Sequence, residues 1–174
     1  FCMMNYFELY NLPEQFAIDL IKLKEHYQTL QKLTHPDRFA TASEQQKRLY
    51  LTKNSQVNDA YSVLKSPVTR GEHLLIVRGV ELPSEQNTVG DVEFLMEQME
   101  WRETLDDATS AEALEKLVVD NHEILVKQER IILAFLSHNN EQGNQAAAQE
   151  LGKMKFMVKL ADEIETKLDR ITDS

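Results

Sequence analysis

The chain has 174 residues, of which 42% are hydrophobic, so it can form one large domain or two small ones with packed cores. The 29 acidic residues outnumber the 19 basic ones, and the net charge of −10 argues against nucleic-acid binding through neutralised phosphates. The single cysteine, Cys2, excludes an internal disulfide and also a cysteine cage for zinc or an iron–sulfur cluster.

No segment of the sequence is typical of a membrane helix or a signal peptide. The longest apolar run, residues 131–136, is far shorter than the roughly 20 residues that a membrane helix needs. The start of the chain lacks the charged segment followed by an apolar one that marks a signal peptide. We therefore expect a soluble, cytoplasmic protein that contacts neither membrane nor nucleic acid.

The charge is distributed unevenly along the chain. Residues 1–78 hold 10 basic and 8 acidic side chains, a net charge of +2, whereas residues 79–174 hold 9 and 21, a net charge of −12. Such asymmetry predicts two parts that face different partners. Solvated acidic helix faces would produce the same asymmetry without any partner.

The first half of the chain reads as short helices, because glycine and proline are few and no alternating strand pattern occurs. The predicted helices span residues 5–12, 19–33, 43–65 and 70–78. Asp19 and Ser43 are suited to capping the second and third helices, and Pro36 ends the second. Apolar residues at helical spacing form the predicted inner faces, namely Leu20, Leu23, Tyr27 and Leu30, and then Leu49, Val57, Ala60, Tyr61 and Leu64.

Three longer helices are predicted after a connector at residues 79–87. They span residues 89–107, 110–138 and 142–171. Apolar stripes on the last two comprise Leu114, Leu117, Asn121, Ile124, Gln128, Ile131 and Phe135, and then Ala147, Leu151, Met154, Val158, Ala161, Ile164 and Leu168. Such stripes bury against antiparallel neighbours, and the joining loops are short, so we expect a three-helix bundle.

The tripeptide His35-Pro36-Asp37 lies in the loop between the second and third predicted helices. Pro36 fixes its own backbone torsion and lacks an N–H donor, so the helix stops and leaves His35 and Asp37 beside its end. The Asp37 carboxylate can accept charge-assisted hydrogen bonds from a partner's arginine. The surrounding cations suit an acidic partner surface. They are Lys22, Lys24, Lys32 and Arg38.

An enzymatic interpretation would make His35 a base oriented by Asp37. The sequence has no serine or cysteine in a recognisable nucleophile elbow and no glycine-rich phosphate loop. The remaining histidines form no metal-ligand pair at helical spacing. They are His26, His73, His122 and His138. We therefore expect neither catalysis, nor a metal site, nor a cofactor.

The tripeptide and its surroundings resemble a J-domain, the module that activates DnaK-type chaperones. The resemblance rests on Tyr27 before the tripeptide, on Phe39 after it, and on residues 57–64 at the end of the third helix. It covers about residues 4–78 and implies a helical hairpin. Many J-domains carry more basic residues just before the tripeptide, whereas this chain has Gln28, Thr29, Gln31 and Thr34 there. That difference implies a weaker or more specialised affinity for the chaperone.

The helix that begins near residue 89 carries two apolar faces. Phe94, Trp101 and Leu105 form one face, which is expected to join the core. A second strip comprises Val92, Leu95, Met96 and Met99. Phe156 on the last helix lies about 140° from the centre of that helix's apolar stripe, at roughly 100° per residue. Surplus apolar surface on a small bundle predicts a partner-binding face, although packing against the connector or the first domain would explain it as well.

Residues 82–86, residues 88–103 and the pair Lys155-Phe156 resemble the HscB family, the co-chaperones of bacterial iron–sulfur cluster assembly. The resemblance implies an all-α protein with a J-domain at residues 1–78 and a three-helix bundle at residues 88–174 that binds the scaffold protein. It also implies two partners, the scaffold protein IscU and the DnaK-type chaperone HscA, whose ATPase the J-domain stimulates. The implied scaffold-binding residues are Leu95, Met96, Met99, Glu100, Glu103 and Phe156.

Met99 and Trp101 stand where we would expect leucines in this family, but both are apolar, so the proposed face is retained. The metal-binding cysteine pairs of some eukaryotic relatives are absent, which favours the bacterial type. Two alternatives remain. A general J-protein would bind many unfolded clients, and a purely structural helical adaptor would have no effect on any chaperone.

Overall fold

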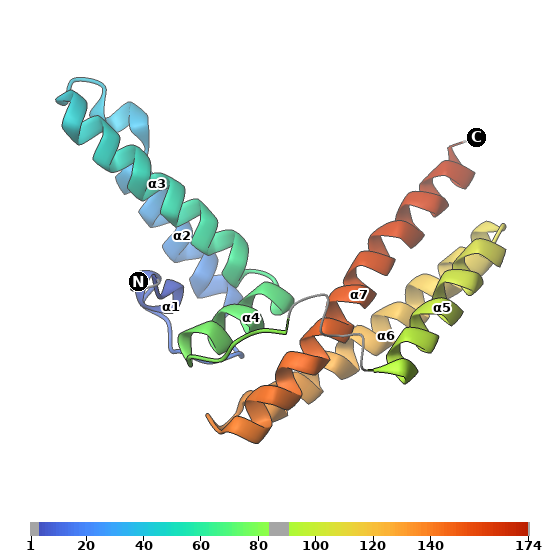
Figure 1. Ribbon diagram of the computed structural model, residues 1–174. Helices are drawn as coiled ribbons and strands as arrows, with labels where there is room; N and C mark the ends of the chain where they lie inside the picture. The colour runs from blue at the N-terminus through green and yellow to red at the C-terminus, as the bar shows by residue number, and fades with distance from the viewer. Residues whose placement is uncertain (1–3, 84–90, 174) are drawn as a thin grey trace. The chain divides into compact units, whose positions relative to one another are not determined.

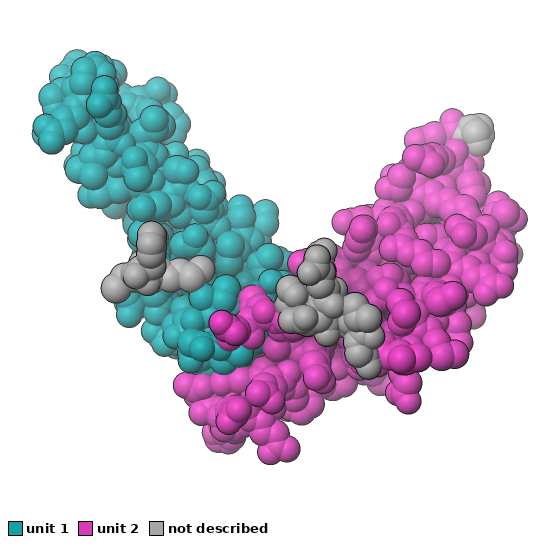
Figure 2. All heavy atoms as spheres, in the orientation of Figure 1, with its two compact units in different colours: residues 1–80 teal, residues 81–174 magenta. Residues whose placement is uncertain are grey.

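The computed structural model describes residues 4–83 and 91–173. Within these ranges the chain forms seven α-helices and one 3-10 helix and has no strand, which confirms the predicted all-α class (Figure 1). The elements are α1 (Tyr6–Leu9), α2 (Leu20–Thr34), η1 (Pro36–Phe39), α3 (Glu44–Leu64), α4 (Pro67–Val77), α5 (Val92–Asp107), α6 (Ala111–Leu136) and α7 (Glu141–Thr172). They group into two compact units, residues 1–80 and 81–174 (Figure 2).

The first unit is built on a hairpin of α2 and α3, which lie side by side (Figure 1). Both predicted caps are present. The Asp19 carboxylate accepts the backbone N–H groups of Ile21 and Lys22, and the Ser43 hydroxyl accepts that of Gln46. Apolar side chains between the helices form the core. Its most deeply buried members are Phe7, Tyr10, Leu23, Val57, Ala60, Leu64, Leu74 and Leu75.

Buried polar contacts join α1 and α4 to this hairpin. The Tyr10 hydroxyl donates to the Val57 carbonyl at 2.7 Å. The ring of His73 on α4 stacks on Tyr6, and its Nε2 accepts the Tyr6 backbone N–H at 3.0 Å. Arg70 donates to the Leu64 carbonyl at 3.0 Å. These bonds satisfy polar groups that would otherwise be costly to bury, so the end of the hairpin that holds α1 and α4 is firmly defined.

Two residues of the predicted inner faces are instead exposed. Leu20 is 52% exposed, and Leu49 is 51% exposed. At about 100° per residue, Leu49 is rotated roughly 80° from Val57, whereas Tyr50 is rotated only about 20°. Tyr50 therefore takes the inner position. Leu20 is the first residue of α2 and is rotated about 60° from the buried Leu23.

The second unit is a three-helix bundle in which α6 packs against α7 along most of their length (Figure 1). Ser110 and Asn140 cap the two helices. The Asn121 side chain on α6 donates to the Met157 carbonyl at 3.0 Å, which satisfies a buried amide. A Cβ at Gly143 would lie 2.5 Å from the Phe135 carbonyl oxygen, so the tight turn between the helices requires glycine there.

Helix α5 runs parallel to α7 and packs on it. The apolar cluster beneath α5 joins all three helices and comprises Leu105, Ala108, Leu114, Leu117, Met157, Leu160 and Ile164. Two lysines of α7 contact the ends of α5. The Lys153 ammonium lies 3.8 Å from the Asp91 carboxylate, and the Lys167 ammonium donates to the Leu105 and Asp106 carbonyls at 2.6 and 3.2 Å. These contacts fix the position of α5 along the axis of α7.

The predicted stripe of α6 was wrong in its second half, whereas that of α7 was wrong at one position, because its later member Ile164 is buried as expected. Ile131 and Phe135 are exposed, and Ile132 and Leu136 are buried in their place. Likewise Val158 is exposed, while its neighbour Met157 is buried. A strict alternation of three and four residues drifts by about 20° per heptad on a straight helix, so the inner position on α6 moves by one residue.

Parts of two predicted elements fall on residues 84–90, outside the described ranges. They are the end of the 79–87 connector and the start of the helix expected from Val89.

The buried His73 predicts a pH dependence of stability. Burial lowers the pKa of His73 below its ordinary value of 6.5. The unfolded chain therefore binds this proton more readily, and the stability that neutral His73 contributes, present above pH 6.5, is lost as the pH falls towards the lowered pKa. We expect the melting temperature of the wild-type chain to fall between about pH 7 and pH 5.5.

The variant His73→Gln keeps an acceptor for the Tyr6 N–H but does not titrate, so its melting temperature should fall less over the same range. Melting followed by circular dichroism checks this, and every other titrating group is shared by the two proteins. An equal fall in both proteins would contradict the assignment to His73.

Candidate functional site

The His35-Pro36-Asp37 loop is held open at the end of α2. His35 ends the helix with an extended backbone, and Pro36 begins η1. The Nδ1 atom of His35 accepts the Asp37 backbone N–H at 3.2 Å, so the proton of the neutral ring sits on Nε2. The side chain of His35 is 50% exposed and that of Asp37 is 94% exposed. The loop thus presents one N–H donor and one carboxylate to a partner.

The predicted cations of this region do not form one cluster. All are exposed, but on α2 Lys22 and Lys24 point about 160° apart at roughly 100° per residue. Lys22 also lies about 15 Å along the helix from Lys32, which is in the last turn. Arg38 is in η1, next to the tripeptide. The cations nearest to the loop are therefore Lys32 and Arg38.

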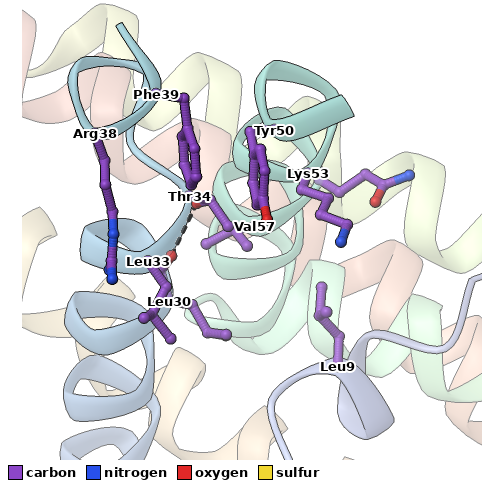
Figure 3. A pocket seen from close by; sticks show the side chains of 10 residues that line it. Leu9, Leu30, Leu33, Thr34, Arg38, Phe39, Tyr50, Lys53 and Val57 are labelled. Carbon is purple, nitrogen blue, oxygen red and sulfur yellow. Dashed lines mark hydrogen bonds between the residues drawn. The ribbon is translucent and has the colours of Figure 1, made fainter. Parts of the chain in front are cut away.

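Beside the loop the structure has a hollow that the sequence did not predict. It has a volume of about 530 Å³ and opens between α2, η1 and α3 (Figure 3). The lining residues are Leu9, Leu30, Leu33, Thr34, Arg38, Phe39, Tyr50, Lys53, Gln56 and Val57. They include two cations and no carboxylate. An acidic segment with apolar side chains is the complement of this surface.

The walls of this hollow are made by local contacts. The rings of Phe39 and Tyr50 are stacked, with centroids 3.5 Å apart, and both are visible in Figure 3. The Thr34 hydroxyl donates to the Leu30 carbonyl at 2.8 Å and accepts from Asn54 at 3.1 Å. The stacked pair brings together residues eleven positions apart on two different elements, which periodicity within one helix does not reveal.

The predicted second strip of α5 is exposed. Leu95, Met96 and Met99 are 54%, 58% and 64% exposed. Glu100 and Glu103 are exposed as well and border these residues on the same helix. The opposite face of α5 carries the buried Leu105. The structure thus brings five of the six predicted scaffold-binding residues onto one exposed face.

Phe156, the sixth of these residues, lies on α7 and is half-buried. Its ring meets Phe94 of α5 edge to face at 5.9 Å, and the Arg102 guanidinium lies 5.3 Å from its centroid. Arg102 also pairs with Glu163 on α7. Arg102 is rotated only about 20° from Leu95 on the α5 surface. Arg102 therefore lies between the exposed strip and Phe156 and connects them. The sequence pattern did not indicate this role.

The described residues contain no group of three or more histidine, cysteine, aspartate or glutamate side chains that could hold a metal ion. Among the helices in the described ranges, none combines the length and hydropathy needed to cross a membrane. The geometry consists of two surfaces with polar and apolar contact groups, one on each compact unit.

Comparison with known proteins identifies the family. Residues 90–165 match the family described as the HSCB C-terminal oligomerisation domain. A protein of Pseudoalteromonas atlantica named co-chaperone protein HscB homolog is 50% identical, and the alignment covers 98% of this chain and 99% of that protein. One of the same name from Shewanella oneidensis is 40% identical over 98% of this chain and 100% of its own length.

Solved structures agree with these relatives. The chaperone HscB from Vibrio cholerae is 37% identical and superposes with a TM-score of 0.85, over 97% of this chain and 99% of the other. The human co-chaperone protein HscB is 29% identical, with a TM-score of 0.88 over 96% of this chain and 83% of the other. Full-length similarity at this level of identity means that the chain belongs to the HscB family.

Proposed function

We propose that this chain is a cytoplasmic co-chaperone of iron–sulfur cluster assembly. In this proposal it binds the scaffold protein IscU, delivers it to the DnaK-type chaperone HscA and stimulates the ATPase of that chaperone. It is an activator and has no catalytic activity of its own. The observation that carries the proposal is that one chain joins an exposed His-Pro-Asp loop to an exposed apolar strip, on two separate compact units.

The first unit supplies the chaperone contact in this proposal, with the J-domain at residues 1–78. Asp37 offers a carboxylate that is 94% exposed, which suits a bidentate bond to an arginine of the chaperone. Next to it, Arg38 and Lys53 at the hollow suit an acidic surface. Complementary charges of this kind speed association and select the partner.

The second unit supplies the scaffold contact, within residues 88–174. Leu95, Met96 and Met99 are each more than half exposed, and burying their apolar surface against a partner is favourable. Methionine side chains adapt to an irregular partner surface. Glu100 and Glu103 border the strip and favour a partner with basic residues around its apolar contact.

Joining the two contacts in one chain explains delivery. A scaffold held by the second unit has a high effective concentration at the chaperone that the first unit engages. Two contacts of modest affinity therefore suffice for transfer.

The variant His35→Gln tests the chaperone contact. It removes the imidazole whose Nδ1 accepts the Asp37 N–H and whose Nε2–H faces a partner. We expect loss of HscA ATPase stimulation, measured as phosphate release, with unchanged IscU affinity measured by calorimetry. His122→Gln changes an exposed histidine of the second unit and should retain stimulation. Full stimulation by His35→Gln would exclude the proposed role of the loop.

Alanine variants of Leu95, Met99 and Phe156 test the scaffold contact. Each should weaken IscU binding by about 1–2 kcal/mol, because each removes apolar area from the centre of the interface. Val119→Ala on α6 removes a side chain of similar exposure (56%) outside the strip and is the matched control. Phe156→Ala also loses contacts within the bundle, so its melting temperature must be measured alongside.

Unaltered IscU affinity in Leu95→Ala and Met99→Ala would show that the strip is not the scaffold contact. Equal affinity of the wild-type chain for unrelated unfolded peptides would favour a general J-protein instead.

A further inference from the structure

A second hollow lies inside the second unit, between α5, α6 and α7. It has a volume of about 280 Å³. The residues that line it come from all three helices. They are Phe94, Glu97, Trp101, Ile124, Lys127, Gln128, Ile131, Glu150, Lys153, Phe156 and Met157. The hollow shares Phe156 with the proposed scaffold contact, so a partner on the α5 strip can also reach into it.

Gln128 is the unusual member of this lining. Its side chain is only 7% exposed, and its Oε1 is a buried acceptor without a hydrogen-bond partner among the residues that the structure describes. Asn121, one heptad earlier on the same face of α6, is satisfied by the Met157 carbonyl. An unsatisfied buried acceptor destabilises a fold, so an apolar side chain would be expected at position 128. A ligand that donates a hydrogen bond would remove the cost.

The rings around the hollow already accept cations. The Arg102 guanidinium lies 5.3 Å from the Phe156 ring, and the Lys153 ammonium lies 5.9 Å from the Phe94 ring. Trp101, whose indole is the most favourable face for a cation, also lines the hollow. The carboxylates of Glu97 and Glu150 provide counter-charges there, although Lys127 and Lys153 offset them. Over residues 79–174 the net charge of −12 favours a basic ligand.

We propose that this hollow binds an arginine side chain of the scaffold protein. The inference rests on the proposed function and adds the chemistry of one partner residue to it. A guanidinium group is planar and carries five N–H donors, so one group combines stacking on an aromatic ring with hydrogen bonds to an amide oxygen such as Gln128 Oε1. A lysine ammonium is compact and strongly hydrated and cannot stack as a flat group on an aromatic ring, so it suits this hollow less well.

The first experiment uses a small probe in place of the scaffold. Trp101 is the only tryptophan of the chain, so its fluorescence reports occupancy of the hollow. We expect N-acetylarginine methylamide to change this fluorescence saturably, and N-acetylcitrulline methylamide, its uncharged analogue, to bind at least about tenfold more weakly. Gln128→Leu should lose the response, and Leu95→Ala should keep it. No change in Trp101 fluorescence, or an equal change with both probes, would overturn the proposal.

The second experiment measures stability and IscU affinity together. Gln128→Leu removes the unsatisfied acceptor, so its melting temperature should equal or exceed that of the wild type. Its affinity for IscU should nevertheless fall about tenfold, because the arginine loses its acceptor. If the hollow holds only water, Gln128→Leu loses the hydrogen bonds to that water. Its melting temperature should then fall while its IscU affinity stays unchanged, and this result would overturn the proposal.

Glu97→Gln provides a second variant, since Glu97 is exposed and its substitution leaves the core intact. It should weaken IscU binding severalfold, whereas Glu93→Gln, one turn earlier on α5 and outside the lining, should not. The two proposals fail separately. Unchanged affinity in Leu95→Ala and Met99→Ala would reject the scaffold contact. Weakened binding in those variants with full affinity in Gln128→Leu and Glu97→Gln would reject only the arginine site.

Discussion

The packing of α6 against α7 determines what the second unit can present to a partner. These two long helices bury their stripes against each other, and the bond from Asn121 to the Met157 carbonyl satisfies the amide between them. Helix α5 packs against a pair of helices whose apolar stripes already bury each other. It needs one face for contact with α6 and α7, which leaves its other face in water. The exposed strip of Leu95, Met96 and Met99 is therefore a consequence of the architecture, and no distortion of α5 is needed to produce it.

In the first unit, the two ends of the α2–α3 hairpin carry different kinds of contact. The polar anchors that involve Tyr10, Arg70 and His73 lie at the end where α1 and α4 pack. The opposite end carries the His-Pro-Asp loop, and the hollow beside the loop extends from Phe39 and Tyr50 to Leu9 and Val57. The loop itself is thus separated from the polar contacts that stabilise the fold. Substitutions in the loop are accordingly expected to alter binding more than folding.

Much of this organisation follows from patterns that lie within single helices. The caps at Asp19 and Ser43, the loop opened by Pro36 and the second apolar face of α5 all depend on neighbours in sequence, so a local reading predicts them. Errors appeared where the position along a long helix mattered. The stripe of α6 moves from Ile131 to Ile132 because a real helix has about 3.6 residues per turn. Both hollows escaped prediction because their walls come from different elements, whose contacts are set by packing.

The two lysine contacts between α7 and α5 have a consequence for how this protein can change over evolutionary time. Asp91 and the Leu105 carbonyl are fourteen residues apart, and so are their partners Lys153 and Lys167. Because the two helices run parallel, both contacts form only while the spacing between them is the same on each helix. Inserting or deleting one residue between the contacts would break one of them and turn the strip by about 100° towards a neighbouring helix. The two contacts therefore constrain the length of the α5 segment between them, in addition to the side chains that form its core and its exposed strip.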